Sequence, residues 1–154
     1  MGMNFSKYLV AFLLTIPNFC YAISASDRHC LVVAVYKEAR GESYKGKLGV
    51  AEVIRNRAGH PDFKPSICGV VKQQGQFSWY SGPRSLQIKP GQLKQPQDKL
   101  AYVEANKAAT EALSGSDLTH GSLYFVHRRV VKKQRWLKKM RFQVRIGQHH
   151  FYGE

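Results

Sequence analysis

Glu38 is the residue whose type and position most clearly suggest chemistry. Leu31, Ala34 and Val35 recur at helical spacing and define an apolar face. Glu38 falls at the centre of that face, so its carboxylate is drawn toward the core or into a cleft, where desolvation raises its pKa. A carboxyl group with a raised pKa can act as a general acid near neutral pH and protonate a leaving oxygen, as in glycosidic bond cleavage.

The alternative role for Glu38 is structural. A buried glutamate can instead pair with an arginine or cap backbone donors. Three arginines are available in this region: Arg40, Arg55 and Arg57. Burial alone does not decide between the two interpretations.

Two helices joined by a short turn are expected to position Glu38. The first runs from Asp27 to about Arg40, and Gly41 can end it. The second covers roughly residues 47–58, and Glu52 is expected to point away from its apolar face. That face consists of Val50, Ala51, Ile54 and Ala58.

A third helix and a small sheet complete the expected fold. The alanine-rich segment 98–113 predicts a helix, and the proline- and glycine-containing segment 79–96 predicts a long loop. Residues 122–127 and 142–146 are typical of short strands. The chain of 154 residues is therefore predicted to contain one α+β domain, with a helical core and a small antiparallel sheet in its C-terminal part.

The first 22 residues have the pattern of a secretory signal peptide. Lys7 precedes the apolar run 8–16, Pro17 breaks that run, and Cys20-Tyr21-Ala22 offers small residues before a cleavage site. A short membrane anchor or a buried helix is the alternative. We expect residues 1–22 to be a signal peptide and residues 23–154 to be the functional domain.

Export would place the remaining cysteines, Cys30 and Cys68, in an oxidising compartment. A disulfide between them would close a long loop and stabilise the fold by about 3–4 kcal/mol. Two buried free thiols are the alternative, because the sequence does not report the Cα separation that a disulfide requires.

Several blocks of the chain resemble SleB/CwlJ-type cell wall hydrolases, the family that includes spore cortex-lytic enzymes. The blocks are VYKEARGESYKG (35–46), LGVAEVIRNRA (48–58), ICGVVKQQGQFSW (67–79), ALSGSDLTHGSLYF (112–125), Trp136 and IGQHHFYG (146–153). They occur in order over nearly all of the chain after residue 22, and the EARGE and GQFSW blocks together are specific.

The resemblance implies a lysozyme-like catalytic domain that cleaves the MurNAc–GlcNAc backbone of peptidoglycan as a lytic transglycosylase. The first glutamate of the EARGE block, Glu38, would be the catalytic residue. Glu42 is the leading candidate for a second carboxylate, but we expect it to orient the site or pair with an arginine. A muramidase or an N-acetylmuramoyl amidase is the alternative activity.

Further substrate-binding candidates are polar and aromatic. We expect Phe77 to pack while Gln76 and Ser78 line one wall of a cleft, because sugars bind to aromatic faces and amide groups. Trp79, Tyr124 and Tyr152 are candidates for glycan contacts, since buried Tyr and Trp side chains need polar partners. His149 matches a position of this family, and the resemblance implies a structural or substrate-orienting role for it.

No metal or other cofactor is expected. His127, His149 and His150 lack the spacing of HExxH and related metal motifs. Neighbouring residues on a strand point to opposite faces of a sheet, so His149 and His150 would rarely bind one ion.

The formal net charge of +14 and a run of basic residues indicate an anionic partner. Residues 127–141 contain eight Lys and Arg side chains and no acid. We expect attraction to the anionic cell envelope rather than to nucleic acid, because no nucleic-acid module is present. A basic, non-catalytic protein that binds the envelope or nucleic acid is the alternative from another class.

Composition also limits location and assembly. No apolar stretch is long enough for a permanent membrane span, so a periplasmic, extracellular or cell-wall-associated protein is expected. The oligomeric state cannot be read from the sequence, but no long apolar edge demands a partner, which favours a monomer.

Overall fold

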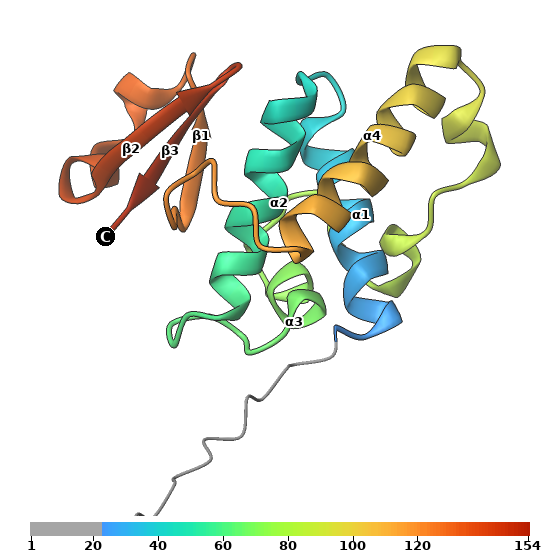
Figure 1. Ribbon diagram of the computed structural model, residues 1–154, viewed down its shortest axis with the longest axis horizontal. Coiled ribbons are helices and arrows are strands. Elements are labelled where there is room, and N and C mark those ends of the chain that lie inside the picture. Colours follow the sequence, from blue (N-terminus) through green and yellow to red (C-terminus); the bar gives the residue numbers. More distant parts are fainter. Residues whose placement is uncertain (1–22) are drawn as a thin grey trace, which may run out of the picture.

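The computed structural model describes residues 23–154 and confirms the α+β class (Figure 1). The predicted signal peptide lies outside the described residues. The helices of the first part are α1 (Ala25–Ala39), α2 (Tyr44–Ala58), α3 (Ile67–Lys72), α4 (Pro96–Leu113) and the short 3₁₀ helices η1 (Pro83–Leu86) and η2 (Pro90–Leu93). None of these described helices has the length and apolar character needed to cross a bilayer.

Helix α1 is the central element of the helical part. Ser24 begins it by accepting a hydrogen bond from the backbone N–H of Asp27. Residues 31–36 are each at most 2% exposed, because α2, α3, α4 and η1 all contact this helix. The sequence predicted one apolar face, whereas the middle of α1 is enclosed on every side.

A disulfide joins α1 to α3. Cys30 and Cys68 are bonded, with their Cα atoms 5.3 Å apart and a sequence separation of 38. The Asp27 carboxylate also accepts a hydrogen bond from the backbone N–H of Cys68 at 2.7 Å. These two links fix α3 against the N-terminal half of α1.

The C-terminal part forms an antiparallel sheet in the order β1-β3-β2. Its elements are β1 (Tyr124–His127), the 3₁₀ helices η3 (Val131–Lys133) and η4 (Arg135–Lys139), β2 (Arg141–Ile146) and β3 (His149–Gly153). The sequence predicted the outer strands but not β3, which follows a two-residue hairpin turn at Gly147-Gln148. Gly147 has a φ of 58°, which suits the tight turns that connect hairpin strands.

The sheet lies against α2, on the side away from α1 and α4 (Figure 1). Phe151 of β3 is fully buried there. A Cβ atom at Gly49 of α2 would lie only 2.7 Å from the Phe151 ring. The missing side chain at Gly49 therefore allows the sheet to approach α2 closely.

The sequence led us to expect that Glu52 of α2 points away from the core, but the structure shows it buried. Its side chain is 0% exposed, and its carboxylate accepts hydrogen bonds from the backbone N–H groups of Leu118 and Thr119 at 3.0 and 2.9 Å. The prediction was wrong because α2 is covered on two sides, by the other helices and by the chain that leads into the sheet.

Replacing Glu52 by alanine is expected to destabilise the fold by about 3 kcal/mol or more, because two buried N–H donors would lose their acceptors. Glu52→Gln keeps an acceptor oxygen and should cost less. Denaturant unfolding measures both, with Glu154→Ala as a control that should change stability by less than about 0.5 kcal/mol. Equal stability of Glu52→Ala and the control would contradict this role.

Candidate active site

Glu38 lies in the last turn of α1, where the enclosure of this helix ends. Its side chain is half-buried, and its Oε1 accepts a hydrogen bond from the indole Nε1 of Trp79 at 2.7 Å. Within residues 23–154, no cationic side chain lies within 4.0 Å of the Glu38 carboxylate. The structure therefore does not place Glu38 in a buried ion pair.

Burial raises the pKa of Glu38 above its ordinary value. The Trp79 hydrogen bond and the positive charge of Arg57 oppose this shift, since both favour the carboxylate, but burial is the larger effect. The group thus retains its proton at a higher pH than an exposed glutamate does. That is the property required of a general acid.

Arg57, near the end of α2, is a cation whose charge acts on this carboxyl group. Its guanidinium donates hydrogen bonds to the carbonyl oxygen of Leu123 at 2.7 Å and to Gln76 Oε1 at 3.1 Å. It also lies 5.4–5.9 Å from the ring centres of Phe63, Tyr124 and Phe125. Burial lowers its pKa to about 10, so the side chain remains cationic at neutral pH.

The sequence suggested Arg57 only as an ion-pair partner for Glu38. A signal for its location was present, because Arg57 follows Val50, Val53 and Ile54 at helical spacing on a buried face. The same reasoning that singled out Glu38 would have placed this guanidinium in the interior.

The segment 76–79 has mixed roles. Phe77 is buried and stacks on Trp79, with ring centres 5.7 Å apart. Gln76 is bonded to Arg57, and Ser78 is exposed. The structure therefore brings Trp79 to Glu38 directly and Gln76 through Arg57, while Ser78 faces solvent.

Glu42 is not on the same helical face as Glu38, because α1 ends at Ala39. Its Oε2 accepts a hydrogen bond from the backbone N–H of Gln148 at 3.1 Å, in the turn between β2 and β3. A Cβ atom at Gly147 would approach the same oxygen to 2.7 Å. The structure thus pairs Glu42 with backbone rather than with an arginine.

His149 begins β3 and is buried among rings. The ring centres of Phe125 and His127 lie 5.3 and 5.7 Å from its own. Burial lowers the pKa of His149, although the negative charge of Glu42 acts in the opposite direction. Its Nδ1 is buried without a hydrogen-bond partner among the described residues.

The two tyrosine candidates, Tyr124 and Tyr152, are register partners across β1 and β3, so their side chains share one face of the sheet. Tyr124 contacts Arg57 and therefore belongs to the surroundings of Glu38. Tyr152 is grouped with Phe142 and His150, at ring distances of 5.7 and 6.5 Å. Because side chains alternate along β3, this face is opposite Phe151. The contacts of the two rings differ: Tyr124 reaches Arg57, whereas Tyr152 packs on Phe142 and His150.

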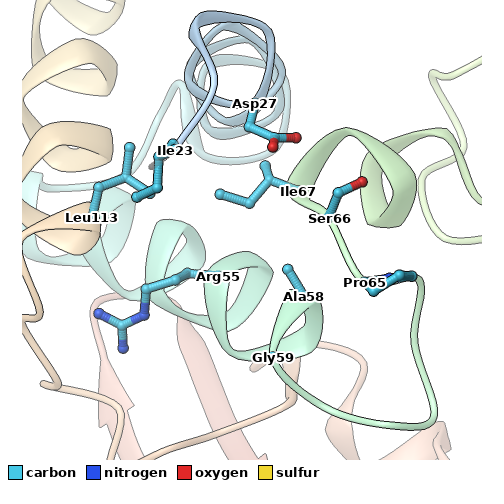
Figure 2. Close-up of a pocket in the computed structure, with 9 residues that line it drawn as sticks. All are labelled: Ile23, Asp27, Arg55, Ala58, Gly59, Pro65, Ser66, Ile67 and Leu113. Carbon is cyan, nitrogen blue, oxygen red and sulfur yellow. The ribbon is translucent and has the colours of Figure 1, made fainter. Parts of the chain in front are cut away.

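Hollows adjoin both ends of the segment that runs from Lys37 to Ser43. One, of about 460 Å³, has Lys37 in its lining, and the other, of about 390 Å³, is lined by Ser43 and Gly147 among others. A third, apolar hollow of about 440 Å³ is lined by Ile23, Ile67 and Leu113 among others (Figure 2). The third opens at the N-terminal end of α1, about 16 Å along the helix from Glu38, and does not belong to this site.

The fold and the site define a class: a helical domain with an attached antiparallel sheet that presents one half-buried carboxyl group at the end of its central helix. The chain belongs to the Cell Wall Hydrolase family, whose profile matches residues 41–152. This match confirms the resemblance carried by the sequence blocks. Glu38 lies just before the matched range, so its catalytic role remains a proposal based on the geometry above.

Similar proteins agree with this membership. The chain is 31% identical to the spore cortex-lytic enzyme of Halalkalibacterium halodurans over 128 residues, which are 83% of this chain and 35% of that protein. It is 32% identical to the spore cortex-lytic enzyme of Bacillus subtilis over 135 residues, 87% of this chain and 40% of that protein. The chain thus spans well under half the length of these curated relatives.

Two solved structures share the fold. The catalytic domain of the Bacillus cereus SleB protein superimposes with a TM-score of 0.69 at 27% identity, over 86% of this chain and 93% of that domain. The catalytic domain of the germination-specific lytic transglycosylase SleB from Bacillus anthracis gives 0.65 at 28% identity, over 86% of this chain and 98% of that domain.

Proposed function

We propose that this protein degrades peptidoglycan by cleaving the bond between N-acetylmuramic acid and N-acetylglucosamine as a lytic transglycosylase. The observation that carries the proposal is the Glu38 carboxyl group, which is half-buried, hydrogen-bonded only by Trp79 among the described residues, and raised in pKa. The similar protein from Bacillus anthracis is itself named a lytic transglycosylase.

In the first step, Glu38 donates its proton to the oxygen that links the two sugars. The C–O bond to the muramic acid carbon breaks, and the released N-acetylglucosamine end retains the proton. The neighbouring acetamido group stabilises the oxocarbenium-like centre that remains. The Trp79 N–H is already directed at the Glu38 carboxyl group, so it stabilises the carboxylate as it forms.

In the second step, the Glu38 carboxylate removes a proton from the C6 hydroxyl of the same muramic acid. The C6 oxygen then bonds to the reacting carbon and closes a 1,6-anhydro ring, which returns Glu38 to its protonated form. No activated water is needed, so one carboxyl group suffices. This agrees with the engagement of Glu42 by the Gln148 backbone.

The glycan is proposed to lie against the aromatic and polar side chains around Glu38. Trp79 and Tyr124 offer ring faces, and Gln76 and Ser78 offer polar groups. His149 is proposed to orient the turn at residues 147–148, whose Gln148 N–H binds Glu42, because His149 and this turn lie where β2 and β3 meet. Tyr152, the register partner of Tyr124, is proposed to contribute only by supporting the sheet.

Mass spectrometry of fragments released from purified sacculi tests the proposed reaction. Lytic transglycosylase action leaves muramic acid ends that lack one water relative to the hydrolysis product. Reducing muramic acid ends would indicate a muramidase, and released peptides would indicate an amidase. A protein that binds sacculi without releasing fragments would support the non-catalytic alternative.

The variant Trp79→Phe is expected to move the alkaline limb of the pH profile of kcat/KM to higher pH. The Trp79 hydrogen bond favours the charged form of Glu38, so its loss raises the pKa of that carboxyl group further. Activity requires the protonated group, so it would persist to higher pH. Tyr80→Phe is the control, and an unchanged or acid-shifted limb for Trp79→Phe would oppose this assignment.

We also propose that the protein acts outside the cytoplasm, with residues 1–22 as its signal peptide. Peptidoglycan as the substrate requires such a location. Residues 127–141 contain eight cationic side chains, and Trp136 in the same segment is 40% exposed. This basic segment would attract the protein to the anionic envelope, and no nucleic-acid partner is proposed.

A further inference from the structure

A hollow lined by polar side chains near the C-terminal end of α1 has no role in the mechanism above. It has a volume of about 460 Å³ and lies between the end of α1 and the segment that carries η1 and η2. The residues that line it include Lys37, Ser81, Arg84, Ser85, Lys89 and Gln92.

Two residues that line the hollow are close in sequence to residues of the Glu38 site. Lys37 directly precedes Glu38, and Ser81 follows Trp79, the hydrogen-bond donor to Glu38, by two residues. Glu38 does not itself line the hollow, so the hollow would contact a substituent of the glycan rather than the bond that Glu38 protonates.

The wall formed by residues 81–92 is fixed to α1 rather than loose. The Tyr36 hydroxyl donates a hydrogen bond to the carbonyl oxygen of Gln92 at 3.1 Å. The His29 ring lies 3.1 Å from the carbonyl oxygen of Leu86, whose side chain is itself buried. A preformed wall reduces the entropy lost when a ligand binds.

The charge of the hollow is one-sided. Lys37, Arg84 and Lys89 line it, and no acidic residue does. In the part of the chain from Ile23 to Glu154, none of these three cations has a carboxylate within 4.0 Å. Cations that are not neutralised by the protein attract an anionic ligand, and an arginine fork fits a carboxylate in particular.

We propose that this hollow binds the carboxylates of the peptide stem attached to the muramic acid at the scissile bond, so that the enzyme prefers stem-bearing glycan; this rests on the proposed function. The stem leaves muramic acid from the lactyl group on the sugar ring. Its free carboxylates are therefore carried beside the ring that Glu38 acts on. Lys37, Arg84 and Lys89 would hold them.

The test compares soluble glycan fragments that carry peptide stems with the same fragments after their carboxylates have been converted to neutral amides. The wild-type protein should have a kcat/KM about tenfold or more higher on the carboxylate form, the size expected for loss of one or two charge-assisted contacts. In the double variant Arg84→Gln/Lys89→Gln this preference should disappear. Both side chains are exposed, so the variant should fold.

Two controls separate the hollow from general attraction. Lys72→Gln/Lys107→Gln removes the same charge from exposed positions outside the hollow and should keep the full preference. Peptide-free strands, whose lactyl carboxylate is free, should be cleaved equally by the wild type and by Arg84→Gln/Lys89→Gln.

Three results would overturn the inference: no preference in the wild type, an unchanged preference in Arg84→Gln/Lys89→Gln, or dependence on these side chains for peptide-free strands. The last would assign the hollow to the lactyl carboxylate. Failure of the proposed function is distinguishable, because it would appear as an absence of anhydro products from every substrate.

Discussion

Glu38→Gln is expected to lower kcat on purified sacculi by about 10³-fold, because it removes the only group proposed to donate and recover the proton. The amide can still accept the hydrogen bond from Trp79, so the surroundings should be unchanged. Release of anhydro-muramic fragments measures the effect. Glu42→Gln is the matched control, and its activity should fall by less than about tenfold, because the amide can still accept the N–H of Gln148.

The Glu38→Gln variant should be as stable as the wild type or more stable. Burial raises the pKa of Glu38 in the folded state, so folding favours its protonated form. The wild type therefore loses stability as the pH rises from the pKa of the unfolded chain through that of the folded one, whereas the glutamine does not titrate. If Glu38→Gln kept wild-type activity while fully folded, the catalytic assignment would be wrong.

Loss of the Cys30–Cys68 disulfide is expected to reduce the free energy of unfolding by about 4 kcal/mol. The bond closes a loop with a sequence separation of 38 residues, and the chain-entropy relation gives this magnitude for such a loop. Urea unfolding of the oxidised protein and of Cys30→Ser/Cys68→Ser measures the difference. A reducing agent should destabilise the wild type and leave the double variant unchanged.

A midpoint of unfolding that is the same with and without the disulfide would contradict this expectation. The hydrogen bond from the Cys68 N–H to Asp27 does not depend on the sulfur atoms. It would be expected to hold α3 only partly in place once the covalent link is lost.

The helical part of the fold could be predicted because local pattern and packing agree there. The expected helices at residues 27–40 and 98–113 correspond to α1 and α4 within two residues at each end. The helix expected from residue 47 begins three residues earlier, at Tyr44, because Ser43 accepts a hydrogen bond from the Gly46 N–H as its cap.

The position of Glu38 was predictable for a related reason. A carboxylate on an apolar helical face must be buried, paired or placed in a cleft, whatever surrounds it. Its hydrogen bond with Trp79 spans 41 residues of sequence and follows from no local pattern. The pairing of Glu42 with the Gln148 backbone, over 106 residues, was likewise beyond local reasoning.

The central strand β3 and the burial of Glu52 were missed because tertiary packing determines both. β3 contains two histidines and two aromatic residues without clear alternation, and it is stabilised by pairing with a strand on each side. Glu52 is buried by a segment more than 60 residues away that supplies two N–H donors. Periodicity within α2 carries no information on such a partner.

The indole of Trp79 also gives this protein a built-in optical probe. The sequence contains two tryptophans, and the other, Trp136, lies on the exposed basic segment. With Trp136 replaced by phenylalanine, emission would come from the ring whose N–H touches the Glu38 oxygen. A fluorescence titration of that variant would follow gain and loss of a single proton at the Glu38 carboxyl group without any substrate present.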